Sequence, residues 1–190
     1  MKTHELYSSQ LRIGTHEISE VFRQELIDEC MRMEENEKCI YRSNQGGYHS
    51  EVQTDKDDYP KLNALGIELL QQLRECVSEH FYIESAWVNI NRSGNWNLLH
   101  NHAPGHLSSV FYIDAEIDSE NVNGSRDGNL IFFDPLGLSA YGRMDSHCYI
   151  VPENKKFLIF PAYLSHMVAP HYSDKPRISV AYNYVEHIEN

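Results

Sequence analysis

Residues 86–113 read AWVNINRSGNWNLLHNHAPGHLSSVFYI. Apolar and polar side chains alternate or form short apolar runs in this stretch, as expected for β-strands with one buried face. The segments RSGN and APG that interrupt it are typical of turns. The stretch therefore predicts consecutive short strands and favours a mainly β fold.

The same pattern continues to the end of the chain. Short strand-like segments are separated by turn sequences such as NVNGSRDG, DPLG and HYSDKP. We predict strands at Tyr82–Asn91, Trp96–His100, Leu107–Asp114, Asn129–Phe133, His147–Val151, Lys156–Phe160, Leu164–Val168 and Arg177–Val185. About eight short strands in succession are typical of a β-barrel or jelly roll.

The first part of the chain has helical periodicity instead. Apolar residues recur at helical spacing over 16–34, where Thr15 is a candidate N-cap, and again from about Pro60. The intervening stretch RSNQGGYHS at 42–50 predicts a loop or tight turn. We expect a single domain of 190 residues, with a helical N-terminal part (1–81) whose two helices buttress a jelly-roll core (82–190).

Composition excludes several classes of protein. The net charge of −12 argues against general nucleic-acid binding, because an acidic surface repels phosphate backbones. No apolar run is long enough to span a membrane, and the N-terminus has no signal-peptide core. The four cysteines form no CxxC motif, which favours reduced thiols. We therefore expect a cytoplasmic protein.

Two histidines, His100 and His102, lie at the end of a predicted strand. Residues at i and i+2 of a strand point to the same face, so both imidazoles can bind one metal ion. Ala103-Pro104-Gly105 ends the strand. The pair is therefore expected at the rim of the sheet, where a metal stays accessible to a substrate.

A third histidine and an arginine follow late in the chain. His166 lies between an apolar strand and a turn, and Arg177 opens the last strand. Three neutral imidazoles can occupy one face of an Fe(II) octahedron, and a buried arginine presents a fork suited to a carboxylate. The order predicts a metal bound by His100, His102 and His166 that holds an acidic cosubstrate, whose far carboxylate pairs with Arg177 and Ser179.

Several other residues are candidates for the same pocket. Asn89 and Asn91 alternate with apolar residues and are candidates for contact with the cosubstrate, whereas Trp87 on the same face is expected to serve in packing. Tyr112 is a candidate hydrogen-bond donor to the cosubstrate carboxylate or a core residue. Asn183 faces the same side as Arg177 by alternation and is a candidate for lining the pocket.

These residues resemble the 2-oxoglutarate- and Fe(II)-dependent oxygenases, and most closely a branch found in bacterial and phage genomes. The resemblance covers most of the chain from about residue 42. It rests on SNQGGYHS (43–50), residues 86–113 and FLIFPAYLSHMVAPHYSDKPRISVAYN (157–183), with GNLIFFDP (128–135) as a linking strand.

The resemblance implies a double-stranded β-helix, a cupin-like jelly roll, with iron ligands in the order HxD…H. By this resemblance His100 is the first ligand, His166 is the distal ligand, and Arg177 with Ser179 binds the C5 carboxylate of 2-oxoglutarate. It further implies that Fe(II), 2-oxoglutarate and O2 are used, and that succinate and CO2 are released as a substrate is hydroxylated. It also suggests that Asn44, Tyr48 and His49, together with Asn183, line the entrance to the substrate-binding site.

The sequence departs from this pattern at His102, which stands where the broader superfamily has a carboxylate, although the branch that it most resembles often has HxH here. We favour direct metal binding by His102. Three alternatives stay open: His102 turns away and leaves a position for water or halide, as in a halogenating enzyme; Asp114 completes the site; or the metal is not iron.

Two rival functions also stay open. One is a jelly-roll protein that binds a small molecule or a metal without turnover, and the other is a three-histidine dioxygenase that does not use 2-oxoglutarate. The sequence does not identify the substrate. A homodimer is expected because jelly rolls often pair through exposed sheet edges.

Overall fold

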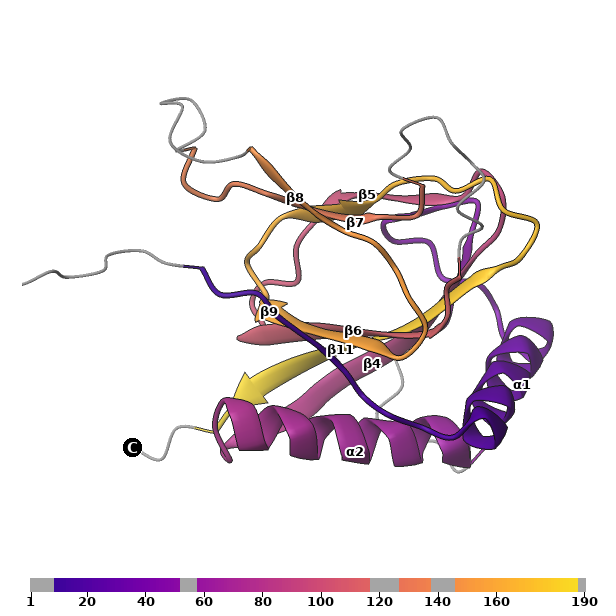
Figure 1. Cartoon of the computed structure of the whole chain (residues 1–190), viewed down its shortest axis with the longest axis horizontal. Coiled ribbons are helices and arrows are strands. Elements are labelled where there is room, and N and C mark those ends of the chain that lie inside the picture. The colour runs from indigo at the N-terminus through magenta and orange to yellow at the C-terminus, as the bar shows by residue number, and fades with distance from the viewer. Residues whose placement is uncertain (1–8, 52–57, 117–126, 138–145, 188–190) are drawn as a thin grey trace, which may run out of the picture.

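A computed structural model describes residues 9–51, 58–116, 127–137 and 146–187. Two antiparallel sheets face each other across the core, and α2 lies along the outer face of the larger sheet (Figure 1). This arrangement confirms the predicted mainly β jelly roll buttressed by two helices.

The sheets have six and five strands. The larger, in the order β1–β9–β6–β11–β4–β3, contains Arg12–Thr15 (β1), Lys156–Pro161 (β9), Leu107–Asp114 (β6), Arg177–Glu186 (β11), Phe81–Asn91 (β4) and Tyr48–His49 (β3). The smaller, in the order β2–β5–β10–β7–β8, contains Asn44–Gln45 (β2), Trp96–His100 (β5), His166–Val168 (β10), Leu130–Phe133 (β7) and His147–Ile150 (β8). All eight predicted strands are present, with ends that differ from the prediction by at most two residues.

Both predicted helices form, but the first begins later than its periodicity suggests. Helix α1 spans Glu20–Asn36, and Ser19 caps it by accepting a hydrogen bond from the backbone N–H of Phe22. Thr15 as N-cap was wrong, because it lies in β1 and pairs with Lys156 of β9. Helix α2 spans Pro60–Cys76, with proline in its first turn as predicted.

The segment predicted as a loop at 42–50 instead contributes a strand to each sheet. Asn44 pairs with Asn97 of the smaller sheet, and Tyr48 pairs with Ile90 of the larger one. Gly46 turns the chain between them with φ +82°, a backbone conformation that favours glycine. The predicted tight turn is therefore present at Gly46, whereas the two-residue strands on either side of it have too little pattern to be recognised from sequence.

The larger sheet is buried on both faces. Phe111 and Ile113 of β6 pack with the helices, whereas Tyr112 between them faces the smaller sheet. This alternation gives one core under the helices and a second between the sheets. In the described ranges no helix is long and apolar enough to cross a membrane, and all four cysteines are free.

The contribution of the core between helix α2 and the larger sheet to stability can be measured. Leu69 of α2 is fully buried. We expect Leu69→Ala to lower the free energy of unfolding by about 2–5 kcal/mol, because it removes buried methyl groups and leaves a cavity. Ile67→Ala on the exposed side of the same helix is the control and should change it by less than about 0.5 kcal/mol. Equal losses in urea titrations would contradict this packing.

Candidate metal centre

Three imidazoles converge at one end of the space between the sheets. Antiparallel pairing of β5 with β10 places His166 opposite His100, and His102 follows just beyond the end of β5. One nitrogen from each ring lies within 4.8 Å of one nitrogen from each of the others. The ring centroids are 4.4 Å apart for His100 and His166, and 4.9 Å apart for His102 and His166.

Main-chain carbonyls fix the orientation of two of these rings. The Nδ1 of His100 is 2.6 Å from the carbonyl oxygen of Leu98, and the Nδ1 of His166 is 2.8 Å from that of Leu164. A carbonyl oxygen only accepts hydrogen bonds, so both Nδ1 atoms must carry the proton. The Nε2 atom of each ring therefore carries no proton, and its lone pair can bind a metal.

Burial keeps the rings neutral at physiological pH. Desolvation, reinforced by the neighbouring imidazoles, lowers the pKa of His166 to about 3 and that of His102 to about 4. Burial also lowers the pKa of His100. Because a protonated imidazole cannot bind a metal, these shifts favour the ligand form of all three residues.

A buried cation lies in the same cavity. The side chain of Arg177 is 3% exposed, its guanidinium stands 4.8 Å from the ring centre of Tyr112, and its Nη1 is 3.4 Å from the Ser179 hydroxyl. Within the described residues, the Arg177 Nε and the Tyr112 hydroxyl are buried without a hydrogen-bond partner. Burial raises the pKa of the Tyr112 hydroxyl, so it stays protonated and able to donate.

These groups line a small pocket that shares part of its wall with a larger groove. The inner pocket has a volume of about 40 Å³, and its lining includes His100, His102, His166, Arg177, Ser179 and Asn89. The outer groove has a volume of about 600 Å³ and shares Ser43, Trp87, His100 and His102 with the inner pocket. Two of the metal-ligand candidates, His100 and His102, therefore lie between the small pocket and the larger groove.

The structure brings some of the other predicted residues to this site. His49 and Asn183 line the outer groove, and the Nδ1 of His102 lies 2.9 Å from the Oδ1 of Asn183. Asn91 points instead to Asn97, to which it donates a hydrogen bond of 3.0 Å.

Asn44 and Tyr48 lie elsewhere. The Asn44 amide bonds to the Arg42 N–H and the Gly47 carbonyl, and the Tyr48 hydroxyl donates to the Met33 carbonyl. Neither residue lines the inner pocket or the outer groove. Their polar atoms hold the β2–β3 connection and helix α1 in place.

Asp114, considered as an alternative ligand, also lies away from the cluster. Its carboxylate is 3.4 Å from the guanidinium of Arg23 on α1. The ligand group found in the described chain contains only the three histidines. Asp114 is therefore not placed to act as a fourth metal ligand beside the three neutral histidines.

Sequence reasoning missed three residues at the site. Trp87, expected to serve in packing, stacks parallel to His49 at 5.7 Å and meets His102 edge-on at 5.2 Å. The sequence signal for this position was that Trp87 lies on the same face of its strand as Asn89, which lines the inner pocket. Ser43 and Asn97 line the inner pocket because β2 pairs with β5, which no local pattern predicts.

Comparison with family models matches residues 85–183 to the family described as "Putative 2OG-Fe(II) oxygenase", where 2OG denotes 2-oxoglutarate. The matched segment runs from β4 to β11 and contains all three histidines and Arg177. Comparison with curated proteins gives no match.

Solved structures with a similar fold include several oxygenases. A prolyl-4-hydroxylase from Pseudomonas putida is 13% identical, with a TM-score of 0.68 over 95% of each chain. A prolyl hydroxylase from Trichoplax adhaerens, solved with a hypoxia inducible factor peptide, is 13% identical, with a TM-score of 0.69 over 93% of this chain and 83% of the other. HygX from Streptomyces hygroscopicus, solved with nickel and 2-oxoglutarate, is 10% identical, with a TM-score of 0.66 over 95% of this chain and 84% of the other.

The buried histidines make the stability of the metal-free protein depend on pH. The pKa of His166 is lowered from 6.5, the ordinary value for an exposed histidine, to about 3 in the fold, so between these values the unfolded chain binds a proton that the folded chain does not. The contribution of this residue to the free energy of unfolding is fully present above pH 6.5 and is lost as the pH falls toward 3. One such proton corresponds to about 1.4 kcal/mol per pH unit.

Replacing His166 by asparagine removes this proton. We expect urea titrations of chelator-treated His166→Asn to show a stability slope between pH 4 and 6 that is shallower than wild type by about 1.4 kcal/mol per pH unit. The two slopes would coincide if the ring were solvated in the folded protein.

Proposed function

The chain belongs to the family of 2OG-Fe(II) oxygenases, and from this premise we propose that it couples the oxidative decarboxylation of 2-oxoglutarate to the hydroxylation of a C–H bond in a substrate. The family uses Fe(II), 2-oxoglutarate and O2. The observation that carries the proposal for this chain is one pocket with three bare imidazole nitrogens and a buried arginine that has no acidic partner among the described residues.

His100, His102 and His166 are the proposed ligands of the iron. Three neutral nitrogen donors suit a divalent first-row metal and leave positions for other ligands. The donor set here fits, because the rings are neutral at pH 7 and their ligand atoms lie close together. Three neutral imidazoles leave the metal with a charge of +2, which favours a dianionic cosubstrate.

Arg177 is the proposed anchor for the C5 carboxylate of 2-oxoglutarate. A carboxylate would complete the hydrogen bonding of the Arg177 Nε and the Tyr112 hydroxyl, which otherwise stay buried and unpaired. The Ser179 hydroxyl lies beside the same guanidinium. Asn89 lines the cavity between these groups and the histidines and is the proposed amide contact to the cosubstrate.

The overall reaction balances as 2-oxoglutarate, O2 and a substrate C–H giving succinate, CO2 and a substrate C–OH. One oxygen atom enters succinate and the other enters the product. When bound, the iron supplies the activation of O2. The protein holds the cosubstrate at its two ends, excludes water with the apolar side chains of Phe160, Leu130 and Val168, and leaves the outer groove for the substrate.

His49 and Asn183 are proposed substrate contacts because both line that groove. Further proposals are a cytoplasmic location and a homodimer. Among the described strands, the sheets end in β1, β3, β2 and β8, and these edge strands are the surfaces expected to pair. Light scattering on the purified protein tests the dimer.

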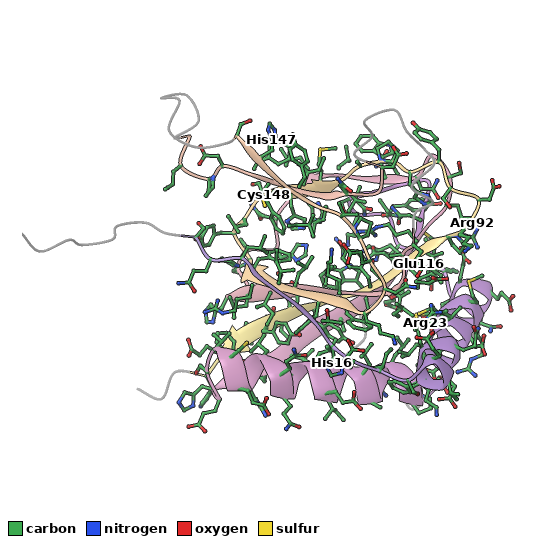
Figure 2. The ribbon with its side chains drawn as sticks, viewed as in Figure 1. His16, Arg23, Arg92, Glu116, His147 and Cys148 are labelled. Carbon is green, nitrogen blue, oxygen red and sulfur yellow. The ribbon has the colours of Figure 1, made fainter. Side chains whose placement is uncertain are left out.

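Metal binding should depend on His166. We expect the wild type to bind Ni(II) in calorimetry, and His166→Ala to bind it more than about 100-fold more weakly, since loss of even an outer hydrogen-bond partner costs about 10- to 100-fold. His147→Ala is the matched control, because His147 lies on β8 at the outer edge of the smaller sheet (Figure 2). Wild-type affinity in His166→Ala would exclude the proposed centre.

Binding of 2-oxoglutarate should depend on the guanidinium group of Arg177. Arg177→Lys keeps the charge but loses the planar pair of donors. We expect the KM for 2-oxoglutarate to rise about 10-fold or more in assays of succinate formed with Fe(II) and air, with a smaller change in kcat. Arg92→Lys, at a half-exposed ion pair with Glu34, is the control (Figure 2).

The same assay separates the rival functions. Binding of 2-oxoglutarate without any succinate would identify a binding protein. Oxygen uptake that does not require 2-oxoglutarate would identify a three-histidine dioxygenase. Either result would contradict the proposal.

A further inference from the structure

His102 is held differently from the other two histidines. Its Nδ1 lies 2.8 Å from the Ser108 hydroxyl and 2.9 Å from the Oδ1 of Asn183, and Ser108 donates to the same Oδ1 at 2.8 Å. The three groups form a closed triangle. Antiparallel pairing of β6 with β11 sets it up, because Ser108 and Asn183 are direct partners across the two strands.

The donors and acceptors in this triangle determine which tautomer of the His102 imidazole is present. The Asn183 Oδ1 only accepts, and it already receives the Ser108 hydroxyl proton. An unprotonated His102 Nδ1 would place two lone pairs against each other at 2.9 Å. A protonated Nδ1 donates to both oxygens, which satisfies the triangle and leaves the Nε2 bare.

We propose that Asn183 and Ser108 are positioning residues that hold His102 in the Nδ1–H form, so that its Nε2 becomes the third metal ligand in place of a carboxylate. The inference rests on the proposed function, because it assigns a role toward the metal of that site. It gives His102 the orientation and proton placement that a third nitrogen ligand requires.

The partner of His102 also sets the strength of this ligand. Across the described residues, no acidic side chain bonds to any of the three rings. A carboxylate behind a ligating histidine raises its basicity, whereas the oxygen of an amide carries no net charge. Asn183 therefore orients His102 while keeping it a neutral donor.

The contrast with His100 and His166 provides an internal control. Their Nδ1 protons go to main-chain carbonyls, which side-chain substitution at Ser108 or Asn183 does not remove. Only His102 should respond to such changes. A matched control variant is Ser109→Ala, because Ser109 is equally buried and bonds to the Tyr184 hydroxyl instead.

The first measurement reads the ring directly. Long-range 1H–15N spectra of metal-free, 15N-histidine-labelled protein distinguish protonated from bare ring nitrogens, with the His102 signals assigned by their loss in His102→Gln. We expect all three site histidines to carry the proton on Nδ1. A wild-type His102 with its proton on Nε2 would overturn the inference.

The second measurement is Ni(II) affinity by competition with a chelator. Asn183→Ala removes an acceptor of the Nδ1 proton, and Ser108→Ala removes the hydroxyl that orients the Asn183 amide, which can then turn its NH2 group toward Nδ1. We expect both variants to populate the other form of His102 and to weaken binding about 10- to 100-fold, with Ser109→Ala at wild-type levels. Asn183→Asp should restore or exceed wild-type affinity, because its carboxylate also accepts from Nδ1. Unchanged spectra and affinity in both alanine variants, or equal losses in Ser109→Ala, would overturn the inference.

These outcomes are independent of turnover. If the spectra are as expected but no succinate forms, the proposed function fails and the positioning role stands. If succinate forms while His102 carries its proton on Nε2, the positioning role fails alone. Should Asn183→Ala not fold, the wild-type spectrum and Ser108→Ala still decide.

Discussion

The register between β5 and β10 is the constraint on which the site depends. It sets His166 directly opposite His100, and both side chains then point into the space between the sheets. A slip of one residue would turn His166 to the other face of the sheet. In the larger sheet, the pairing of β6 with β11 sets Ser108 directly opposite Asn183, and both side chains contact the His102 ring from the other side of that space. The centre is thus assembled by two sheets whose pairings are each fixed by buried faces.

Charge explains why so polar a cavity is tolerated. Burying a guanidinium without a counter-ion is costly, and the structure offers Arg177 no acidic partner within its described ranges. The imidazoles beside it are neutral and add no repulsion. A dianion is the ligand that would offset both Arg177 and a divalent metal. The pocket is therefore arranged around an anion although the chain as a whole carries a net charge of −12.

The sequence predicted the parts of the fold that have a local pattern. Strands such as Leu107–Asp114 and the proline-initiated α2 have clear periodicity, and the spacing of His100 and His102 indicated a metal pair. What it did not predict depends on contacts between distant segments. Ser43 reaches the pocket only because β2 pairs with β5, and the role of Trp87 depends on where His102 lies. Asn44 and Tyr48 sit in the motif that resembles the family, but the Asn44 amide bonds within its own turn and the Tyr48 hydroxyl bonds to helix α1, so neither reaches the groove.

The position of Trp87 gives the protein a built-in optical probe. Its indole lies edge-on to His102, within 5.2 Å between ring centres, and the chain has only one other tryptophan. Open-shell transition metals quench excited indoles at such short range, whereas filled-shell zinc does so far less. If the proposed centre binds metal, an open-shell ion is therefore expected to quench the Trp87 emission of the unlabelled protein more strongly than zinc does.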